Sequence, residues 1–152
     1  MQHRKILACI ALIAVAGSAM AQNAAQVVPP DAVVWKSHPL FPGAQTATLI
    51  GDPSKPETIV QRLKFPPNFK IAPHTHSYAE LGTVLSGTLG WGEGPQFDPS
   101  KGGLLKAGTV FAFKANEPHF VWTTSEETIV QLVYSGPAGI VFSNQADDPR
   151  KK

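Results

Sequence analysis

Short runs of β-forming residues, separated by proline, glycine and asparagine breaks, recur along most of this chain. The runs cover residues 32–36, 45–50, 58–65, 80–85, 88–91, 109–113, 119–124 and 128–135. Apart from residues 6–17, no stretch of the sequence has a long apolar repeat of helical period, and 14 prolines argue against long helices. Many short strands at this spacing predict an all-β fold, either a sandwich or a barrel.

Turn residues separate the predicted strands. Pro66-Pro67-Asn68 predicts a tight turn that leads into a strand carrying His74, and Gly87 predicts a hairpin. The polar, glycine-rich segment 92–103 favours a surface loop. Because long loops in compact folds are often functional, a lid over the mouth of a barrel is the alternative interpretation of this segment.

The first residues have the features of a secretory signal peptide. The basic residues His3, Arg4 and Lys5 precede a short apolar run at 6–17, and small residues follow up to Ala21. This order predicts export to the periplasm or the exterior, with cleavage after Ala21. The apolar run is too short for a comfortable transmembrane helix, so a retained membrane anchor is the weaker alternative.

The predicted cleavage divides the chain into four parts. Removal of the signal peptide, residues 1–21, leaves 131 of the 152 residues, a length that suits one domain. We expect a flexible leader at 22–30, a barrel at 31–145 and a polar tail at 146–152. The single cysteine, Cys9, lies in the signal peptide, so we expect neither a disulfide nor a thiolate metal ligand in the mature protein.

The charge balance argues against one large class of function. The chain has 13 basic and 11 acidic residues, but Arg4 and Lys5 leave with the signal peptide. The mature chain is therefore neutral and lacks the basic surface of a nucleic-acid-binding protein. The basic end, Arg150-Lys151-Lys152, is interpreted as solvated. No membrane association is expected after cleavage.

Three histidines and one glutamate form the clearest chemical signal. His74 and His76 are two residues apart, so a β-strand places both imidazoles on one face, where they can share one ion. Glu80 follows after a connection short enough to turn the chain back toward the same point. A fourth ligand must come from another part of the sheet, and His119 is the remaining histidine placed to supply it.

The spacing of these residues resembles the cupin superfamily, whose small single-domain members are RmlC-like jelly-roll barrels. The first cupin motif has a glycine, five residues, His-x-His, three or four residues, a glutamate, six residues and a glycine. This spacing is matched by His74, His76, Glu80 and Gly87, whereas Asn68 replaces the leading glycine. Asparagine tolerates the left-handed backbone conformation better than most residues do, so this replacement is mild.

The second cupin motif is less complete in this chain. Gly108 and His119 are in register with it. Its proline, glycine and asparagine are replaced by Lys114, Asn116 and Thr123. The resemblance as a whole implies a cupin double-stranded β-helix, and it also implies a homodimer.

Cupins bind a divalent transition metal at four motif positions, which correspond here to His74, His76, Glu80 and His119. The resemblance therefore implies that these four residues are the metal ligands. Nitrogen and oxygen donors are compatible with iron, manganese, zinc, nickel, cobalt or copper, and they do not select one of these metals. No organic cofactor is predicted.

The residues around the predicted ion are mostly apolar or neutral. Val121 and Thr123 share the strand face of the last motif histidine, and Tyr78 and Gln131 could hydrogen-bond a ligand, so these four are the predicted substrate-pocket residues. No residue stands out as an acid or a base, and the catalytic residues stay unassigned. Aromatic residues such as Tyr134 are interpreted as core more readily than as part of a substrate pocket.

Open coordination positions at such an ion would let a small organic molecule bind, which indicates a metal-dependent enzyme. Isomerases and lyases need a positioned proton donor or acceptor, and none is evident, so an oxygenase is slightly favoured. A metal-dependent lyase or isomerase is the nearest alternative. A noncatalytic protein that holds a metal or a small ligand is the alternative from another class, because a fold does not decide the chemistry.

Overall fold

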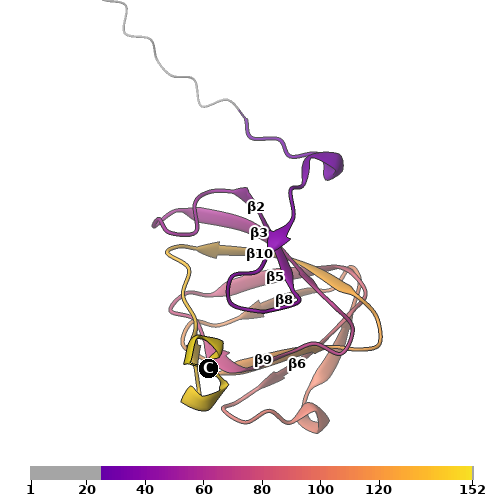
Figure 1. Ribbon diagram of the computed structural model, residues 1–152, viewed down its shortest axis with the longest axis vertical. Helices are drawn as coiled ribbons and strands as arrows, with labels where there is room; N and C mark the ends of the chain where they lie inside the picture. The colour runs from indigo at the N-terminus through magenta and orange to yellow at the C-terminus, as the bar shows by residue number, and fades with distance from the viewer. Residues whose placement is uncertain (1–24, 152) are drawn as a thin grey trace, which may run out of the picture.

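The computed structural model describes residues 25–151, and the predicted signal peptide with its cleavage site lies outside this range. Within it, eleven strands form two antiparallel sheets that face each other (Figure 1), and the helical content consists of four short 3-10 helices. The all-β jelly-roll barrel expected from the sequence is confirmed. None of the helices in residues 25–151 has the length and apolar composition needed to cross a membrane.

The first sheet has six strands in the order β1-β2-β3-β10-β5-β8, and the second has five in the order β11-β4-β9-β6-β7. The first sheet contains β1 (Lys36–Ser37), β2 (Gln45–Ile50), β3 (Thr58–Phe65), β5 (Glu80–Ser86), β8 (Val110–Phe113) and β10 (Thr128–Ser135). The second contains β4 (Lys70–Thr75), β6 (Thr88–Glu93), β7 (Gly103–Lys106), β9 (His119–Thr123) and β11 (Val141–Phe142). The 3-10 helices are η1 (Pro30–Ala32), η2 (Pro99–Lys101), η3 (Gln145–Asp147) and η4 (Pro149–Lys151).

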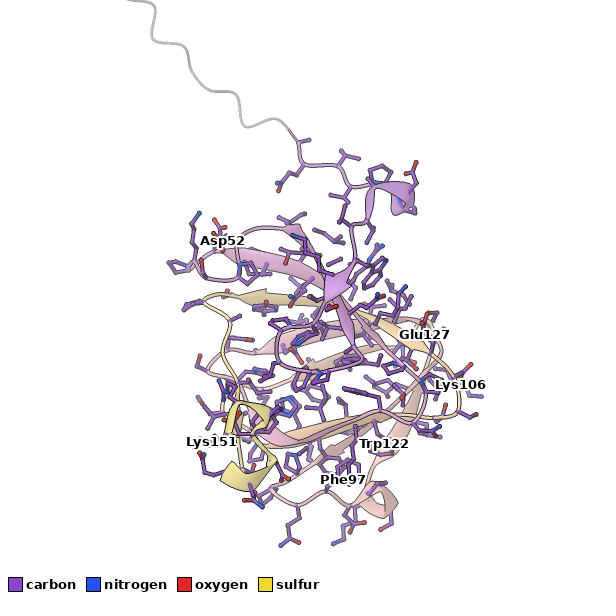
Figure 2. All side chains as sticks on the ribbon, viewed as in Figure 1. Asp52, Phe97, Lys106, Trp122, Glu127 and Lys151 are labelled. Carbon is purple, nitrogen blue, oxygen red and sulfur yellow. The ribbon has the colours of Figure 1, made fainter. Side chains whose placement is uncertain are left out.

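Alternation of side chains explains why these segments form half-buried strands. In β10, the side chains of Thr128, Val130, Leu132 and Tyr134 are buried, whereas those between them are only partly buried. Side chains from the inner faces of both sheets fill much of the space between them, while charged ones such as Lys106 lie at the periphery (Figure 2). Burial of one face of each sheet holds such a two-layer fold together.

Two asparagines occupy positions where the cupin motifs have glycine, and both adopt the backbone conformation that favours glycine. The φ angle is 56° at Asn68 and 63° at Asn116. Asparagine is among the few other residues that enter this left-handed region readily. The backbone N–H of Asn116 donates a hydrogen bond of 2.8 Å to the carbonyl of His76. The altered second motif therefore keeps a turn that supports a histidine of the first motif.

The predicted strand at 32–36 is wrong over most of its length. Pro30–Ala32 form η1, and at the other end only Lys36 belongs to a strand, β1. Figure 1 shows the chain leaving the barrel here, and Val34 is 69% exposed. Without a neighbouring strand to bond its backbone, β-forming composition alone does not make a strand.

The segment 92–103 is mostly a loop, as predicted, but β6 continues to Glu93 and β7 begins at Gly103. Within the loop, the ring of Phe97 packs edge-on against Trp122 with centroids 6.0 Å apart, and Figure 2 shows the two side chains close together. The loop lines no part of the main cavity, so the structure gives the lid interpretation no support. The sequence also did not predict β7 and β11, which are too short to show a clear alternation.

Candidate metal centre

The strand order explains how residues from two distant motifs meet. β4 and β9 are neighbours in the second sheet, and their register places His74 opposite His119. His76 follows β4 directly, and Glu80 is the first residue of β5 in the first sheet. The second sheet therefore holds the histidines together, and the first sheet brings the carboxylate from across the barrel.

The three imidazoles converge on one point. The ring centroid of His74 lies 4.4 Å from that of His119 and 4.9 Å from that of His76. The centroids of His76 and His119 are 5.5 Å apart. One ring nitrogen from each residue lies within 4.8 Å of the other two. The three histidines could therefore hold one metal ion.

Hydrogen bonds to backbone carbonyls orient all three rings. His74 Nδ1 lies 2.8 Å from the carbonyl oxygen of Ala72, and His119 Nδ1 lies 3.1 Å from that of Glu117. His76 Nδ1 bonds the carbonyl of Gly139 in the segment before β11. A carbonyl only accepts, so each Nδ1 carries a proton and each Nε2 of the neutral ring has a free lone pair. This is the tautomer that metal-binding histidines use.

One of these lone pairs has no partner in the protein. His119 Nε2 is buried, and among residues 25–151 it is the buried side-chain nitrogen or oxygen that makes no hydrogen bond. A buried acceptor left without a partner costs about 1–3 kcal/mol. A bound cation would satisfy this atom, so the donor set fits the divalent transition metal that the cupin motifs imply.

Burial keeps the histidines neutral. It lowers the pKa of His74 to about 3, with smaller contributions from the neighbouring His119 and His76. It lowers the pKa of His119 to about 4, partly opposed by the hydrogen bond to Glu117, and it also lowers the pKa of His76. Neutral imidazoles are the form that binds metals.

Glu80 lies beside the histidines but outside their tightest group. Its Oε1 is 3.8 Å from His76 Nε2. It does not belong to the set whose ligand atoms all lie within 4.8 Å of one another. Burial raises the pKa of Glu80 to about 7. A nearby cation would favour the ionised carboxylate, so the geometry leaves Glu80 available either as a fourth ligand or as a proton acceptor beside the ion.

A cavity of about 490 Å³ opens from the histidines through the inside of the barrel. This volume lies within the range of small-molecule sites. The cavity includes all four expected metal-ligand residues in its lining. Much of the remaining lining is apolar, so a bound organic molecule would be largely shielded from water.

The structure brings two of the four predicted pocket residues to this cavity. Tyr78 and Val121 line it, whereas Thr123 and Gln131 do not. Thr123 lies at the far end of β9, where its hydroxyl donates to the carbonyl of Pro66 at 2.7 Å. Gln131 pairs in register with Arg62 and accepts a hydrogen bond from its Nε at 3.0 Å. Both side chains are used in joining structural elements.

Several residues that line the cavity were not assigned to it from the sequence. They are polar or aromatic and come from the β1–β2 connection, four strands of the first sheet and the C-terminal segment: His38, Thr46, Gln61, Phe111, Phe113, Tyr134 and Arg150. Alternation in β3 and β10 could have placed Gln61 and Tyr134 on the inner face. No local spacing marks His38 or Arg150, because the fold alone brings their segments to the cavity.

The comparison with known protein families agrees with the fold and the motifs. Residues 61–135 match the family described as Cupin domain. The matched stretch contains all four expected metal ligands. This chain belongs to the cupin superfamily. A search of curated proteins found no match.

Solved structures with the same fold include proteins of different activity. The polyketide cyclase RemF from Streptomyces resistomycificus aligns with a TM-score of 0.69 and 18% identity, over 84% of this chain and 91% of its own. An RmlC-like cupin from Shewanella frigidimarina aligns with a TM-score of 0.57 and 16% identity, over 72% of this chain and 87% of its own. An oxalate oxidase aligns with a TM-score of 0.52 and 22% identity, over 70% of this chain and 57% of its own. At these identities the similarity shows a shared fold and nothing about a shared reaction.

Proposed function

We propose that this protein is an exported metal-dependent enzyme that acts on a small organic molecule, with oxygen as its co-substrate. The observation that carries the proposal is the convergence of three imidazoles whose Nδ1 atoms are already bonded and whose Nε2 atoms are free. A cavity large enough for a small substrate begins at this point. Cyclase and oxidase structures share the fold, which is compatible with chemistry at such a site.

The residues have separate roles in this proposal. His74, His76 and His119 would hold the ion through Nε2, and Glu80 is the proposed fourth ligand. A redox-active metal bound there supplies the capacity to activate oxygen or to polarise a bound carbonyl. The apolar walls of the cavity exclude water from the bound substrate, which strengthens electrostatic interactions at the reacting atoms.

The scarcity of free proton acceptors favours the oxygenase. Among residues 25–151, Glu80 is the one carboxylate that lines the cavity. The hydroxyl of Tyr134 donates to Gln61 at 3.0 Å, and that of Tyr78 lies 3.4 Å from the carbonyl oxygen of Gly139. The Nδ1 of His38, which also lines the cavity, already accepts two backbone hydrogen bonds. If Glu80 binds the ion, no free base therefore remains among the described residues that line the cavity.

A metal-dependent lyase or isomerase is the second candidate, and one observation favours it. The carboxylate of Glu80 lies outside the group of three histidine nitrogens within 4.8 Å. If it stays off the metal, it is placed to accept a proton from a substrate bound beside the ion. The role of Glu80 therefore separates the two reaction classes.

Metal exchange combined with oxygen uptake tests the proposal. The purified mature protein is loaded separately with iron, manganese, cobalt, nickel, copper or zinc, and oxygen consumption is measured with enol and catechol substrates. We expect uptake that depends on the metal and is absent with zinc. Turnover without oxygen, lost in Glu80→Gln while metal content is kept, would identify the lyase or isomerase instead. Tight ligand retention without turnover for every metal would identify a noncatalytic binding protein.

Export and self-association are separate parts of the proposal. The signal features in residues 1–21 support export, and N-terminal sequencing of the secreted form should begin at Gln22. An intact Met1 on protein from the cytoplasm would contradict export.

A homodimer is proposed from the cupin resemblance, and native mass spectrometry should show twice the mass of the mature chain.

A further inference from the structure

Away from the metal centre, the cavity offers no unpaired charge to a ligand. Among the described residues that line it, only Glu80 and Arg150 carry a side-chain charge apart from histidine. The guanidinium of Arg150 forms two hydrogen bonds of 2.8 Å with the carboxylate of Asp148. The positive charge is thus already paired, so the lining does not favour an anionic ligand in this part of the cavity.

A continuous row of polar side chains leads away from the histidines. The ring of Tyr78 stacks on His76 with centroids 5.1 Å apart, and Tyr134 stacks on Tyr78 at 4.7 Å. The hydroxyl of Tyr134 donates to Gln61 Oε1 at 3.0 Å, and Gln61 Nε2 donates to Thr46 Oγ1 at 2.8 Å. All these residues line the cavity. We call Tyr78, Tyr134, Gln61 and Thr46 the polar band.

The direction of these hydrogen bonds determines which donor and acceptor groups of the polar band remain free for a ligand. Tyr134 uses its single proton on Gln61, and the amide of Gln61 uses one of its two protons on Thr46. The second amide proton and the hydroxyl proton of Thr46 make no bond within residues 25–151. Both are donors. A ligand that satisfies these two protons must therefore carry hydrogen-bond acceptors, while the oxygens of the band also keep lone pairs that accept.

His38 contributes another donor to the cavity. Its Nδ1 accepts hydrogen bonds from the backbone N–H groups of Leu40 and Phe41, at 3.1 and 3.2 Å. A ring nitrogen that accepts carries no proton, so the proton of the neutral ring is on Nε2. The ring is held in place by stacking on Phe41 at 4.7 Å. His38 lines the cavity, and its Nε2–H makes no hydrogen bond within residues 25–151.

Most of the remaining lining is apolar. It includes Leu63, Phe65, Ile71, Leu89, Phe111 and Leu132. These side chains cannot hydrogen-bond a ligand, so they favour an apolar body that fills the space. The polar band runs along one part of this otherwise hydrophobic wall.

We propose that the cavity binds an uncharged organic molecule with an apolar body and with acceptor oxygens, such as carbonyl, ether or ester oxygens, along the edge that faces the polar band and His38. This inference rests on the proposed function in that the same cavity holds the substrate of the metal centre. It names the class of substrate that the enzyme takes. A carboxylate or phosphate that faces the polar band would find no unpaired charge there, so molecules with an anionic group at this edge are excluded from this class.

Three probes of matched shape test the proposal in metal-free protein, so that coordination to an ion does not contribute. They are 2-acetylnaphthalene, which has one acceptor oxygen, 2-naphthoate, which is an anion, and 2-isopropylnaphthalene, which has no oxygen. Equilibrium dialysis should show the ketone binding at least about tenfold more tightly than the anion. It should bind about two- to tenfold more tightly than the hydrocarbon, the range of one neutral hydrogen bond. Equal or tighter binding of 2-naphthoate, no preference for the ketone over the hydrocarbon, or no binding of any probe would overturn the proposal.

Matched variants locate the preference on the polar band. Gln61→Leu and Thr46→Val should each reduce the ratio between ketone and hydrocarbon affinities toward one. The controls Gln131→Leu and Thr83→Val change the same residue types outside the cavity lining and should keep the full ratio. Circular dichroism confirms that each variant folds. A ratio unchanged in Gln61→Leu and Thr46→Val would contradict the assigned role of the band.

Nitrogen-15 NMR of histidine-labelled protein provides an independent test of the donor at His38. The expected spectrum has the proton on Nε2 of His38 at neutral pH. A proton on Nδ1 would remove the argument for this donor. Metal content is measured on separate samples. If the protein binds no metal but keeps its preference for the ketone, the proposed enzyme is refuted and the proposed cavity chemistry is not. If the protein binds metal but shows no preference for the ketone, the cavity chemistry is refuted and the proposed enzyme is not.

Discussion

The two ends of the cavity differ in how their polar groups are satisfied. At the metal end, three imidazoles direct free Nε2 atoms toward one another, and that of His119 is buried without a partner. Along the polar band, Tyr134, Gln61 and Thr46 bond one another and leave two donor protons open, besides lone pairs on their oxygens. The comparison teaches that a bound cation would satisfy the free nitrogen atoms at the metal end, whereas a neutral ligand would be enough to satisfy the open donors at the other end.

The largest expected effect comes from removing a histidine at the metal end. His119→Ala should abolish stoichiometric metal binding, because it removes one of three converging nitrogens. With metal at 100 times its Kd, the wild-type protein gains about 2.7 kcal/mol of stability from binding, and the variant should not show this gain. Elemental analysis and thermal unfolding with and without metal measure both effects.

His38→Ala provides the matched control at the other end of the cavity. It changes a histidine that also lines the cavity but lies outside the converging group. This variant should keep its full metal content and its metal-dependent stabilisation, whatever its effect on folding of the loop. Loss of metal in both variants alike would mean that the two ends are not distinct.

Acid should destabilise the metal-free protein through the same histidines. The folded pKa values of His74 and His119, about 3 and 4, lie below the usual value of 6.5, so below pH 6.5 the unfolded chain takes up protons that the folded protein excludes. Each such histidine lowers the free energy of unfolding by up to about 1.4 kcal/mol per pH unit.

Glu80 acts in the opposite direction. Its raised folded pKa of about 7 lets the folded protein hold a proton between pH 7 and 4.5 that the unfolded chain has released, so it adds stability as the pH falls through this window. Two histidines outweigh one glutamate, and urea unfolding of the metal-free protein should show a net loss from pH 6.5 to 4.5. Stability that is constant or rises on acidification would contradict the neutral, buried histidines.

A smaller effect on stability is expected at Thr123, whose hydroxyl makes its hydrogen bonds within the protein. Its hydroxyl donates to the carbonyl of Pro66 and accepts from the backbone N–H of Phe69 at 2.8 Å. Thr123→Val keeps the shape and leaves the partly buried carbonyl of Pro66 and N–H of Phe69 without this partner, so it should lower the free energy of unfolding by about 1–3 kcal/mol. Metal content should not change. If metal is lost and stability is kept, Thr123 belongs to the site after all.

The smallest effect is expected at Asn116, whose turn supports His76. Asn116→Ala places an alanine at a φ of 63°, which costs about 1–2 kcal/mol. Asn116→Gly removes this strain and should be close to the wild type in stability. Chemical denaturation compares the three proteins. Equal stability of the alanine and glycine variants would show that the left-handed turn is not kept in solution.

The metal end could be predicted from the sequence because the local spacing of residues determines much of its geometry. Side-chain alternation and a short connection are sufficient to group His74, His76 and Glu80. His119 was the remaining histidine placed to supply a fourth ligand, and the motif resemblance implied the same residue. The long strands were equally accessible, since the alternation in β3 and β10 extends over eight residues each. The exact place of Glu80 relative to the ion depends on how the two sheets pack, which spacing does not determine.

The other end of the cavity was not accessible in the same way. Thr46 and Gln61 come from the consecutive strands β2 and β3, but Tyr134 comes from β10, 73 residues after Gln61, and only the order β2-β3-β10 makes all three neighbours. Thr123 shares the strand face of His119, yet the position of a residue along a strand decides whether it reaches the cavity or the end of the barrel. The strand face on which a side chain lies can be inferred from a sequence, whereas its depth inside the barrel depends on tertiary packing.

X-ray absorption spectroscopy of the zinc-loaded protein tests the central claim most directly. Convergence of His74, His76 and His119 predicts three imidazole nitrogens bound to zinc at about 2.0–2.1 Å. The same measurement on His119→Ala should show two imidazoles or no ordered zinc. One imidazole or none in the wild-type protein would contradict the account, because the three Nε2 atoms would then not share an ion.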